Sequence, residues 1–191
     1  MFAAVLDTCV LWPSLQRDFL LSLAIEGLYR PLWSEAILEE LQRHEQLKLV
    51  DRGIGETDAA AKADFLLDQM RSAFGDAIVH DWEALEGSFG LPDIDDEHVL
   101  AAAVVGGAGA IVTENFKDFP SDAVPSTIQI ISARHFAADA VDVNPASALR
   151  ALRQLSSRHT RTPHTPAEIL DILVARYGMN EVDEILRPLV D

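Results

Sequence analysis

The segment Phe2–Asp7, FAAVLD, decides the expected fold. Five consecutive apolar residues that end at an acidic one are typical of a buried parallel strand followed by a functional loop. Further short apolar runs predict strands at 31–33, 77–80, 110–113 and 127–131. The carboxyl ends of parallel strands lie at one edge of the sheet, where ligands bind. Asp7 is therefore expected at a ligand-binding edge.

Stretches with a helical spacing of apolar residues separate these runs. Helices are predicted over 15–28, behind a Ser34 cap, behind a Thr57 cap, and over 97–105, where two glycines follow. The third helix is expected to bury Phe65, Leu66 and Met70. Strands that alternate with helices imply parallel crossovers. The predicted fold class is therefore α/β, a three-layer α/β/α domain with a mainly parallel sheet.

The strand pattern stops after about residue 140. Helices are predicted over 144–155, 165–177 and 180–189, and Thr165-Pro166 is a helix cap with proline at the first helical position. The predicted organisation is an α/β domain over residues 1–140 followed by a helical C-terminal extension over residues 141–191.

The charge balance is strongly acidic: 15 basic and 31 acidic residues give a net charge of −16. By itself this disfavours nucleic acid as a partner, because phosphate binding normally depends on Lys and Arg. Some of the acids are, however, candidate metal ligands. Four arginines also fall in a twelve-residue stretch that contains no acid: Arg150, Arg153, Arg158 and Arg161. They could face a nucleic acid or pair with acids of the core, and the sequence leaves both possibilities open.

A single cysteine, Cys9, excludes an internal disulfide and suits a reducing compartment. The apolar runs are interrupted well before the roughly 20 residues that span a bilayer. The N-terminal segment has no basic leader of the kind that signal peptides carry. A soluble, cytoplasmic protein without a membrane segment is expected.

Acidic side chains occur in four segments that the predicted topology brings toward one edge. Asp7 ends the first strand, and Glu40 in SEAILEELQR lies near the apolar face of its helix. Asp96 lies in the acidic helix start LPDIDDEHVLAAA, and Asp118 follows the strand at 110–113. Each has a plainer explanation as a cap, a solvated face or a turn. Together they form an all-oxygen donor set, which suits Mg²⁺ or Mn²⁺ far better than zinc.

Four motifs in this order resemble those of the PIN domain family: LDTCVLW, SEAILEEL, DDEHVLAAA and IVTENFKDFP. The resemblance covers about residues 1–135. It implies a metal-dependent endoribonuclease that hydrolyses RNA phosphodiester bonds, in many relatives the VapC toxin of a toxin–antitoxin pair. It also implies an RNA substrate, a cognate antitoxin protein and a homodimer.

The resemblance assigns roles by position in the motifs. The catalytic carboxylates and ligands of Mg²⁺ or Mn²⁺ would be Asp7, Glu40, Asp96 and Asp118. Thr113 would orient the site by hydrogen bonding, and Asp93 would be an outer acid. Asn115 stands where many relatives have an acid, which weakens the case for a second metal ion.

Two other functions are compatible with parts of the pattern. A PIN-like module that has lost catalysis and acts through protein partners would explain the acidic surface and Asn115. A phosphatase of the haloacid dehalogenase type shares a strand that ends in LDT. That phosphatase is the weaker alternative, because Cys9 and Leu11 break its DxDxT motif.

Overall fold

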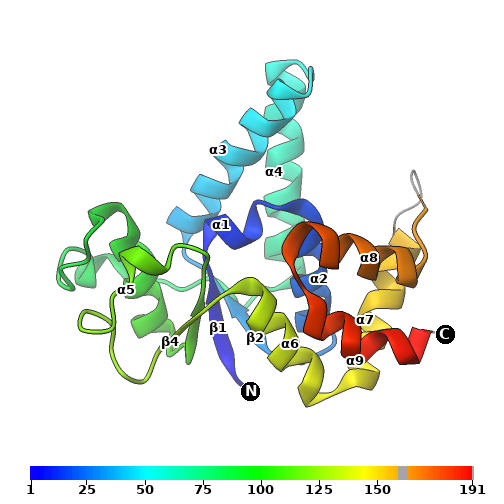
Figure 1. Cartoon of the computed structure of the whole chain (residues 1–191). Coiled ribbons are helices and arrows are strands. Elements are labelled where there is room, and N and C mark those ends of the chain that lie inside the picture. The colour runs from blue at the N-terminus through cyan, green and yellow to red at the C-terminus, as the bar shows by residue number, and fades with distance from the viewer. Residues whose placement is uncertain (159–162, 191) are drawn as a thin grey trace.

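The computed structural model describes residues 1–158 and 163–190. Its centre is a sheet of four parallel strands in the order β2-β1-β3-β4 (Figure 1). The strands are β1 (Ala3–Leu6), β2 (Arg30–Leu32), β3 (Ala110–Val112) and β4 (Gln129–Ile131). Every pair is parallel. The predicted α/β class is confirmed.

Helices cover both faces of the sheet, and further helices pack around them. The α-helices are α1 (Thr8–Leu11), α2 (Ser14–Ile25), α3 (Glu35–Asp51), α4 (Glu56–Ala73), α5 (Glu97–Gly106), α6 (Ala133–Val143), α7 (Pro145–Arg158), α8 (Pro166–Tyr177) and α9 (Asn180–Val190). Figure 1 shows α5 on one side of the strands and α2 and α6 on the other, while α3 and α4 form a protruding hairpin. This is the predicted three-layer arrangement.

The first strand is buried on both faces, as its unbroken apolar run predicts. Ala4, Val5 and Leu6 are fully buried. Val5 is flanked by Leu32 on β2 and Ile111 on β3. Because β1 is a central strand, its C-terminal end projects Asp7 into the middle of the sheet edge.

The predicted helix caps are confirmed at three places. Ser34 accepts a hydrogen bond from the Ile37 amide and starts α3. Thr165 and Glu168 form a reciprocal capping box at the start of α8. Gly107, with φ of +64°, ends α5 in the left-handed conformation that glycine adopts without strain.

Two local predictions are wrong. Residues 77–80 do not form a strand of the sheet; they make one isolated bridge between Trp33 and Ile78. The reason is that the chain turns into α3 at Ser34, so no extended partner continues beyond Trp33. Thr57 does not cap the third helix, since α4 starts at Glu56 behind Gly55 without a side-chain cap.

The apolar stripe of α4 also differs from the prediction. Phe65 is 64% exposed. The buried residues recur every three or four positions on the face that packs against α3: Ala59, Ala63, Leu67 and Met70. Small alanines allow the two helices to approach closely, whereas Phe65 lies outside this stripe.

The predicted C-terminal helices are present, and an additional helix, α6, precedes them. Helix α6 runs through residue 140, where the division of the chain was predicted. Buried residues of α6 to α9, such as Val141, Leu152, Leu170 and Leu186, belong to the same apolar core as the sheet. Among the described residues, no helix combines the length and apolar character needed to cross a membrane.

Candidate active site

Asp7 is fixed by groups from two strand ends. It is 5% exposed, and its Oδ2 accepts a hydrogen bond of 2.6 Å from Thr113 Oγ1. The fully buried Thr113 also receives the Asn115 amide at 2.9 Å. Because β1 and β3 are hydrogen-bonded neighbours, Thr113 orients Asp7 across 106 residues of sequence. The hydrogen-bonding role predicted for Thr113 is consistent with this geometry.

Cys9 lies beside this pair. Burial and the charge of Asp7 raise the pKa of the Cys9 thiol to about 12. The thiol is therefore protonated at neutral pH, and its Sγ donates to Asp7 Oδ2 over 3.1 Å. Cys9 orients the carboxylate and is unsuited to act as a nucleophile.

Glu40 is held on both of its oxygens. Thr8 Oγ1 donates to Oε2 over 2.7 Å, and His98 Nε2 lies 3.3 Å from Oε1. Burial favours the neutral acid, but the hydrogen bonds from His98 and Thr8 outweigh it and lower the pKa of Glu40. The same contact with Glu40 overcomes burial and raises the pKa of His98. The two side chains form a charge-stabilising pair at the edge of the site.

Asp96 faces the other acids from the start of α5. Burial, together with the negative charges of Asp7 and Asp118, raises the pKa of Asp96 to about 6. Asn115 Nδ2 donates to Asp96 Oδ2 over 3.1 Å. Burial is the main cause of the raised pKa, and the nearby carboxylates add to it, while His98 opposes them.

Asp118 is buried next to this group. It is 6% exposed, and its Oδ2 has no hydrogen-bond partner. Lys117 Nζ lies 3.6 Å from that oxygen, which is an ion-pair distance beyond hydrogen-bond range. An unpartnered buried carboxylate oxygen is costly unless a cation compensates it.

A pocket of about 360 Å³ joins most of these side chains. It is lined by Asp7, Thr8, Cys9, Trp12, Glu40, His44, Asp96 and Asn115. Asp118 and Thr113 are buried beside it and do not line it. Asp93 is exposed, and its carboxylate caps the Asp95 amide at 3.0 Å.

The carboxylates lie in the same region, but their oxygens do not surround one common position where a metal ion could bind. Among the residues that the structure describes, no three His, Cys, Asp or Glu side chains are positioned together to hold a metal ion. Glu40 is engaged by Thr8 and His98, and Asp96 by Asn115. Joint coordination of one ion would require rotation of these side chains.

Glu97 and His98, which follow Asp96 directly, have structural roles that the sequence pattern did not distinguish from that of Asp96. Glu97 is 2% exposed and accepts backbone hydrogen bonds from Phe89, Gly90 and Leu91. It fixes the loop before α5 and does not belong to the pocket. His98 supports Glu40, although its spacing in the sequence gave no indication of a ligand. Both side chains are buried, whereas Asp96 is half-buried and lines the pocket.

A comparison with protein-family models finds a match over residues 3–117, described as a PIN domain. The chain belongs to the PIN domain family. The matched span includes β1, α3, the start of α5 and the end of β3. Three of the carboxylates proposed as ligands, Asp7, Glu40 and Asp96, therefore lie on elements of this PIN domain.

One curated relative supports the same family. The chain is 37% identical over 79 residues to a Mycobacterium tuberculosis (strain ATCC 25618 / H37Rv) protein named "Putative ribonuclease VapC50". The alignment covers 41% of this chain and 47% of that protein, so the chain spans about half the length of the relative. The comparison with solved structures found no match.

The arginine-rich stretch of α7 lies outside the matched PIN span. Arg150 Nε pairs with Glu26 Oε2 at 2.8 Å, and Arg158 donates to Ser22 Oγ at 3.1 Å. Arg153 is exposed, and Arg161 lies outside the described residues. Pairing with an acid of the core, one of the two possibilities left open by the sequence, is thus found at Arg150.

Proposed function

We propose that this PIN domain is a Mg²⁺- or Mn²⁺-dependent endoribonuclease. The observation that carries the proposal is the pocket at the carboxyl edge of the parallel sheet, in which Asp7, Glu40 and Asp96 come from three separate elements. Such an edge is where α/β proteins bind ligands. Three carboxylates in one open pocket are unsuited to bind a phosphodiester unless a cation neutralises them.

The donor set fits a hard divalent ion. All candidate ligands are oxygens, and Asp118 Oδ2 is buried without a hydrogen-bond partner. Burial, followed by the charges of Asp7 and Asp118, raises the pKa of Asp96. Asp7, Glu40, Asp96 and Asp118 would hold the ion. When bound, Mg²⁺ or Mn²⁺ supplies a Lewis acid for phosphodiester hydrolysis. Asn115 contributes an amide where a second acidic ligand would otherwise stand.

The chain's own residues keep the carboxylates aligned. Thr113 and Cys9 orient Asp7, Thr8 and His98 hold Glu40, and Asn115 positions Asp96. These contacts hold each carboxylate in place in the metal-free chain, and joint binding of one ion would exchange some contacts of Glu40 and Asp96 for metal ligands. The orienting hydrogen bonds are therefore expected to matter for turnover as well as for stability.

The name of the curated relative supports a more specific biological setting. We propose that the chain is the toxin of a toxin–antitoxin pair, acts on RNA in the cytoplasm, forms a homodimer and is neutralised by a cognate antitoxin protein. Growth arrest on expression, relieved by a neighbouring small gene, is the expected result. Expression without any effect on growth would contradict the toxin role and leave the nuclease proposal standing.

The nuclease proposal is tested by cleavage of end-labelled RNA. Activity with Mn²⁺ is expected to fall by about a hundredfold or more in Asp7→Asn and Asp96→Asn, because each loses a charged ligand. EDTA should abolish it, and Lys62→Gln on the exposed face of α4 serves as a control. Equal activity in the Asp7 and Asp96 variants would contradict the proposal, because cleavage would then not depend on these carboxylates.

A PIN-like binding module without catalysis is the second candidate. It is favoured by the lack of three jointly positioned ligands in the described residues and by Asn115. Calorimetric titration with Mn²⁺ separates the two functions. A nuclease requires heat of binding that disappears in Asp96→Asn, whereas a module that acts only through protein partners would show none and cleave no RNA.

A further inference from the structure

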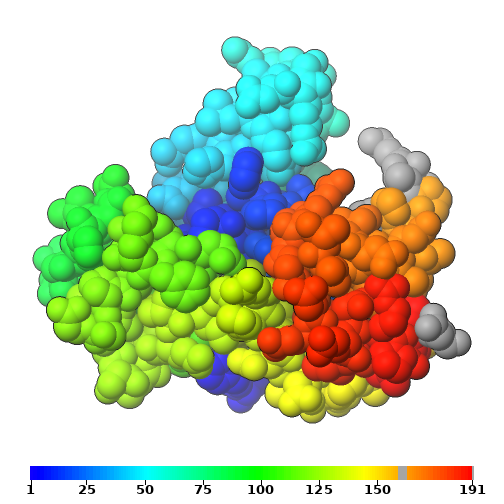
Figure 2. All heavy atoms as spheres, viewed as in Figure 1, coloured from blue at the N-terminus to red at the C-terminus, as the bar shows by residue number. Residues whose placement is uncertain are grey.

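The pocket that Asp7, Glu40 and Asp96 line is called the acidic pocket below. A second pocket, of about 330 Å³, adjoins it. Its lining includes Trp12, Asp18, Lys48, Arg52, Arg176 and Tyr177, and it is called the basic pocket below. Trp12 lines both pockets. The basic pocket is formed by α2, the end of α3 and the end of α8, so it brings the C-terminal helices next to the PIN domain. Figure 2 shows the N-terminal segment, in blue, between α3 in cyan and the C-terminal helices in orange.

The basic pocket differs in charge from the rest of this acidic protein. Lys48, Arg52 and Arg176 line it, against one carboxylate, Asp18. Arg52 and Arg176 are exposed, and neither has a carboxylate within 4.0 Å among the described residues. In a chain with a net charge of −16, two such free guanidinium groups in one pocket form a local site for an anion.

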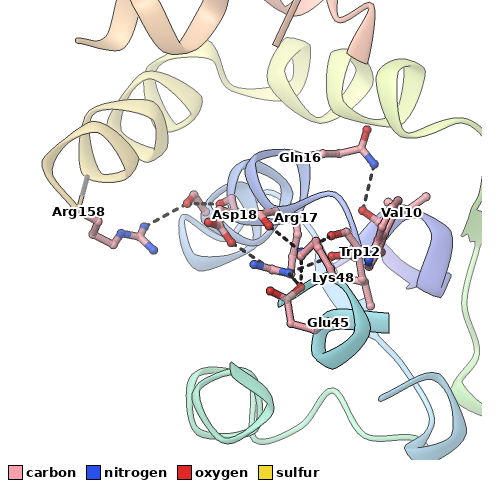
Figure 3. A network of polar contacts seen from close by, with 11 residues as sticks. Val10, Trp12, Gln16, Arg17, Asp18, Glu45, Lys48 and Arg158 are labelled. Carbon is pink, nitrogen blue, oxygen red and sulfur yellow. Dashed lines mark hydrogen bonds and ion pairs between the residues drawn. The ribbon is translucent and has the colours of Figure 1, made fainter. Parts of the chain in front are cut away.

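An ionic network that includes Arg17 and Glu45 shares Asp18 and Lys48 with the lining of the basic pocket (Figure 3). Arg17, 5% exposed, pairs with Asp18 at 3.1 Å and with Glu45 at 3.8 Å. Lys48 pairs with Glu45 and donates to Ser14 Oγ over 3.0 Å. The charges of Arg17 and Lys48 are thus matched by carboxylates. The charge available to a ligand is that of the two exposed arginines.

Trp12 is fixed at the boundary between the two pockets. Lys48 Nζ lies 5.8 Å from the centre of its ring and donates to its carbonyl over 3.3 Å. The His44 ring centre lies 6.3 Å from that of Trp12, at an interplanar angle of 60°. The indole remains 43% exposed. An exposed aromatic ring held in place by its neighbours is a suitable stacking surface for a base.

The second aromatic ring and one arginine come from α8. Tyr177 is half-buried and lies at the C-terminal end of α8, next to Arg176. The helix is anchored by its capping box, by Gly178, and by the Arg187 hydrogen bond to the Ala167 carbonyl at 3.3 Å. The pocket therefore combines two free arginines with two aromatic rings on rigid elements.

We propose that the basic pocket binds the single-stranded RNA flank next to the scissile phosphodiester. Arg52 and Arg176 pair with a backbone phosphate, and Trp12 and Tyr177 stack on bases. The RNA strand passes from the acidic pocket across Trp12 into the basic pocket. This inference rests on the proposed function for the choice of RNA. Phosphate recognition by arginine and stacking on aromatic rings are the two contacts that sequence-tolerant single-strand binding uses.

Binding is measured separately from cleavage. Fluorescence anisotropy measures the affinity for a labelled single-stranded RNA oligonucleotide with phosphorothioate linkages. The buffer contains EDTA, so that binding through a metal ion does not contribute. The double variant Arg52→Gln/Arg176→Gln is expected to weaken binding about tenfold at low salt. It should also reduce the slope of log K against log [salt] by about 0.7, the value for one lost phosphate contact on a single strand. Tyr177→Ala should weaken binding about fivefold or more without a change in this slope.

Lys62→Gln is the matched control, because Lys62 is exposed on α4 and does not line the basic pocket. It should bind within about twofold of the parent chain and keep most of the salt dependence. Thermal melting confirms that each variant is folded. Binding by the double variant that equals the parent would overturn the proposal. Binding of polyglutamate more tightly than the oligonucleotide would overturn it as well, since the site would then favour an acidic peptide.

The outcomes for this site and for the nuclease can be separated. Mn²⁺-dependent cleavage that needs Asp7, together with unchanged oligonucleotide binding by the double variant, would leave the nuclease standing and remove the basic pocket. Binding that needs both arginines, without cleavage by the parent chain, would support the basic pocket as a nucleic-acid site and contradict the nuclease.

Discussion

At the scale of single residues, acids that look alike in the sequence have different surroundings. Asp96 faces the negative charge of Asp7 and Asp118, whereas Glu97, the next residue, is buried under three backbone amides. The pKa of Asp96 is raised, and that of Glu97 is lowered because backbone hydrogen bonds outweigh burial. Asp96 precedes α5 and lines the pocket, whereas Glu97 is the first residue of α5 and its carboxylate accepts from the loop at residues 89–91.

Thr113→Val is a test of residue-scale orientation. Loss of the 2.6 Å hydrogen bond to Asp7 and of the contact with the Asn115 amide leaves buried polar groups without partners. The variant should be destabilised by about 1–3 kcal/mol and should cleave RNA more slowly. Thr113→Ser keeps the hydroxyl and should recover most of the activity. Denaturant unfolding and RNA cleavage assays measure the two effects, and a fully active Thr113→Val would exclude an orienting role.

We expect Glu97 to make a contribution to the free energy of unfolding that depends on pH. Its folded-state pKa lies below the unfolded value of about 4.3. The stabilisation is therefore complete above that unfolded value and is lost as the pH falls through the lower folded value. Glu97→Gln should lower the free energy of unfolding at pH 7 by about 1–3 kcal/mol and flatten its dependence on acidic pH. Urea unfolding at a series of pH values measures this, and parallel curves for both proteins would contradict it.

At the scale of elements, the ends of strands and helices decide where the site residues lie. Asp7 follows β1, Thr113 follows β3, and Asp96 precedes α5, so three loops converge at one edge of the sheet. Ser34 starts α3, on which Glu40 lies in the second turn. The caps therefore fix the site as much as the strands do.

Gly107 is a test of element-scale geometry. Its φ of +64° lies in the left-handed region, and a side chain there is strained even though no atom lies within 4 Å of the added Cβ. Gly107→Ala should lower the free energy of unfolding by about 1 kcal/mol. Gly75→Ala is the matched control, since Gly75 also has open space but no positive φ. Equal melting temperatures for the two variants would contradict the backbone argument.

At the scale of the whole molecule, the C-terminal helices complete the structure. Buried side chains of α7, including Ala151, Leu152 and Leu155, share the core of the sheet, and α7 packs along α2. The boundary predicted near residue 140 marks the end of the strand pattern. It lies inside α6, so the residues on its two sides are parts of one helix.

A shortened chain tests whether the α/β domain depends on the C-terminal helices. A protein that ends at Asn144 would expose the apolar face of α2 that α7 covers. It should aggregate or lose cooperative unfolding, because large exposed apolar patches favour association. Light scattering and thermal melting measure these properties. A soluble, cooperatively folded 1–144 protein would show that the α/β domain is independent of the extension.

The sequence by itself determined the burial of the first strand, the α/β class and the segments that carry the acids. These follow from local patterns: an unbroken apolar run such as FAAVLD, a serine cap, a glycine at a helix end. The isolated bridge at Ile78, the exposed Phe65 and the separate roles of Asp96, Glu97 and His98 were decided by the tertiary structure. The physical reason is that burial and charge depend on which distant segments pack together, and the position of a residue in a motif does not contain that information.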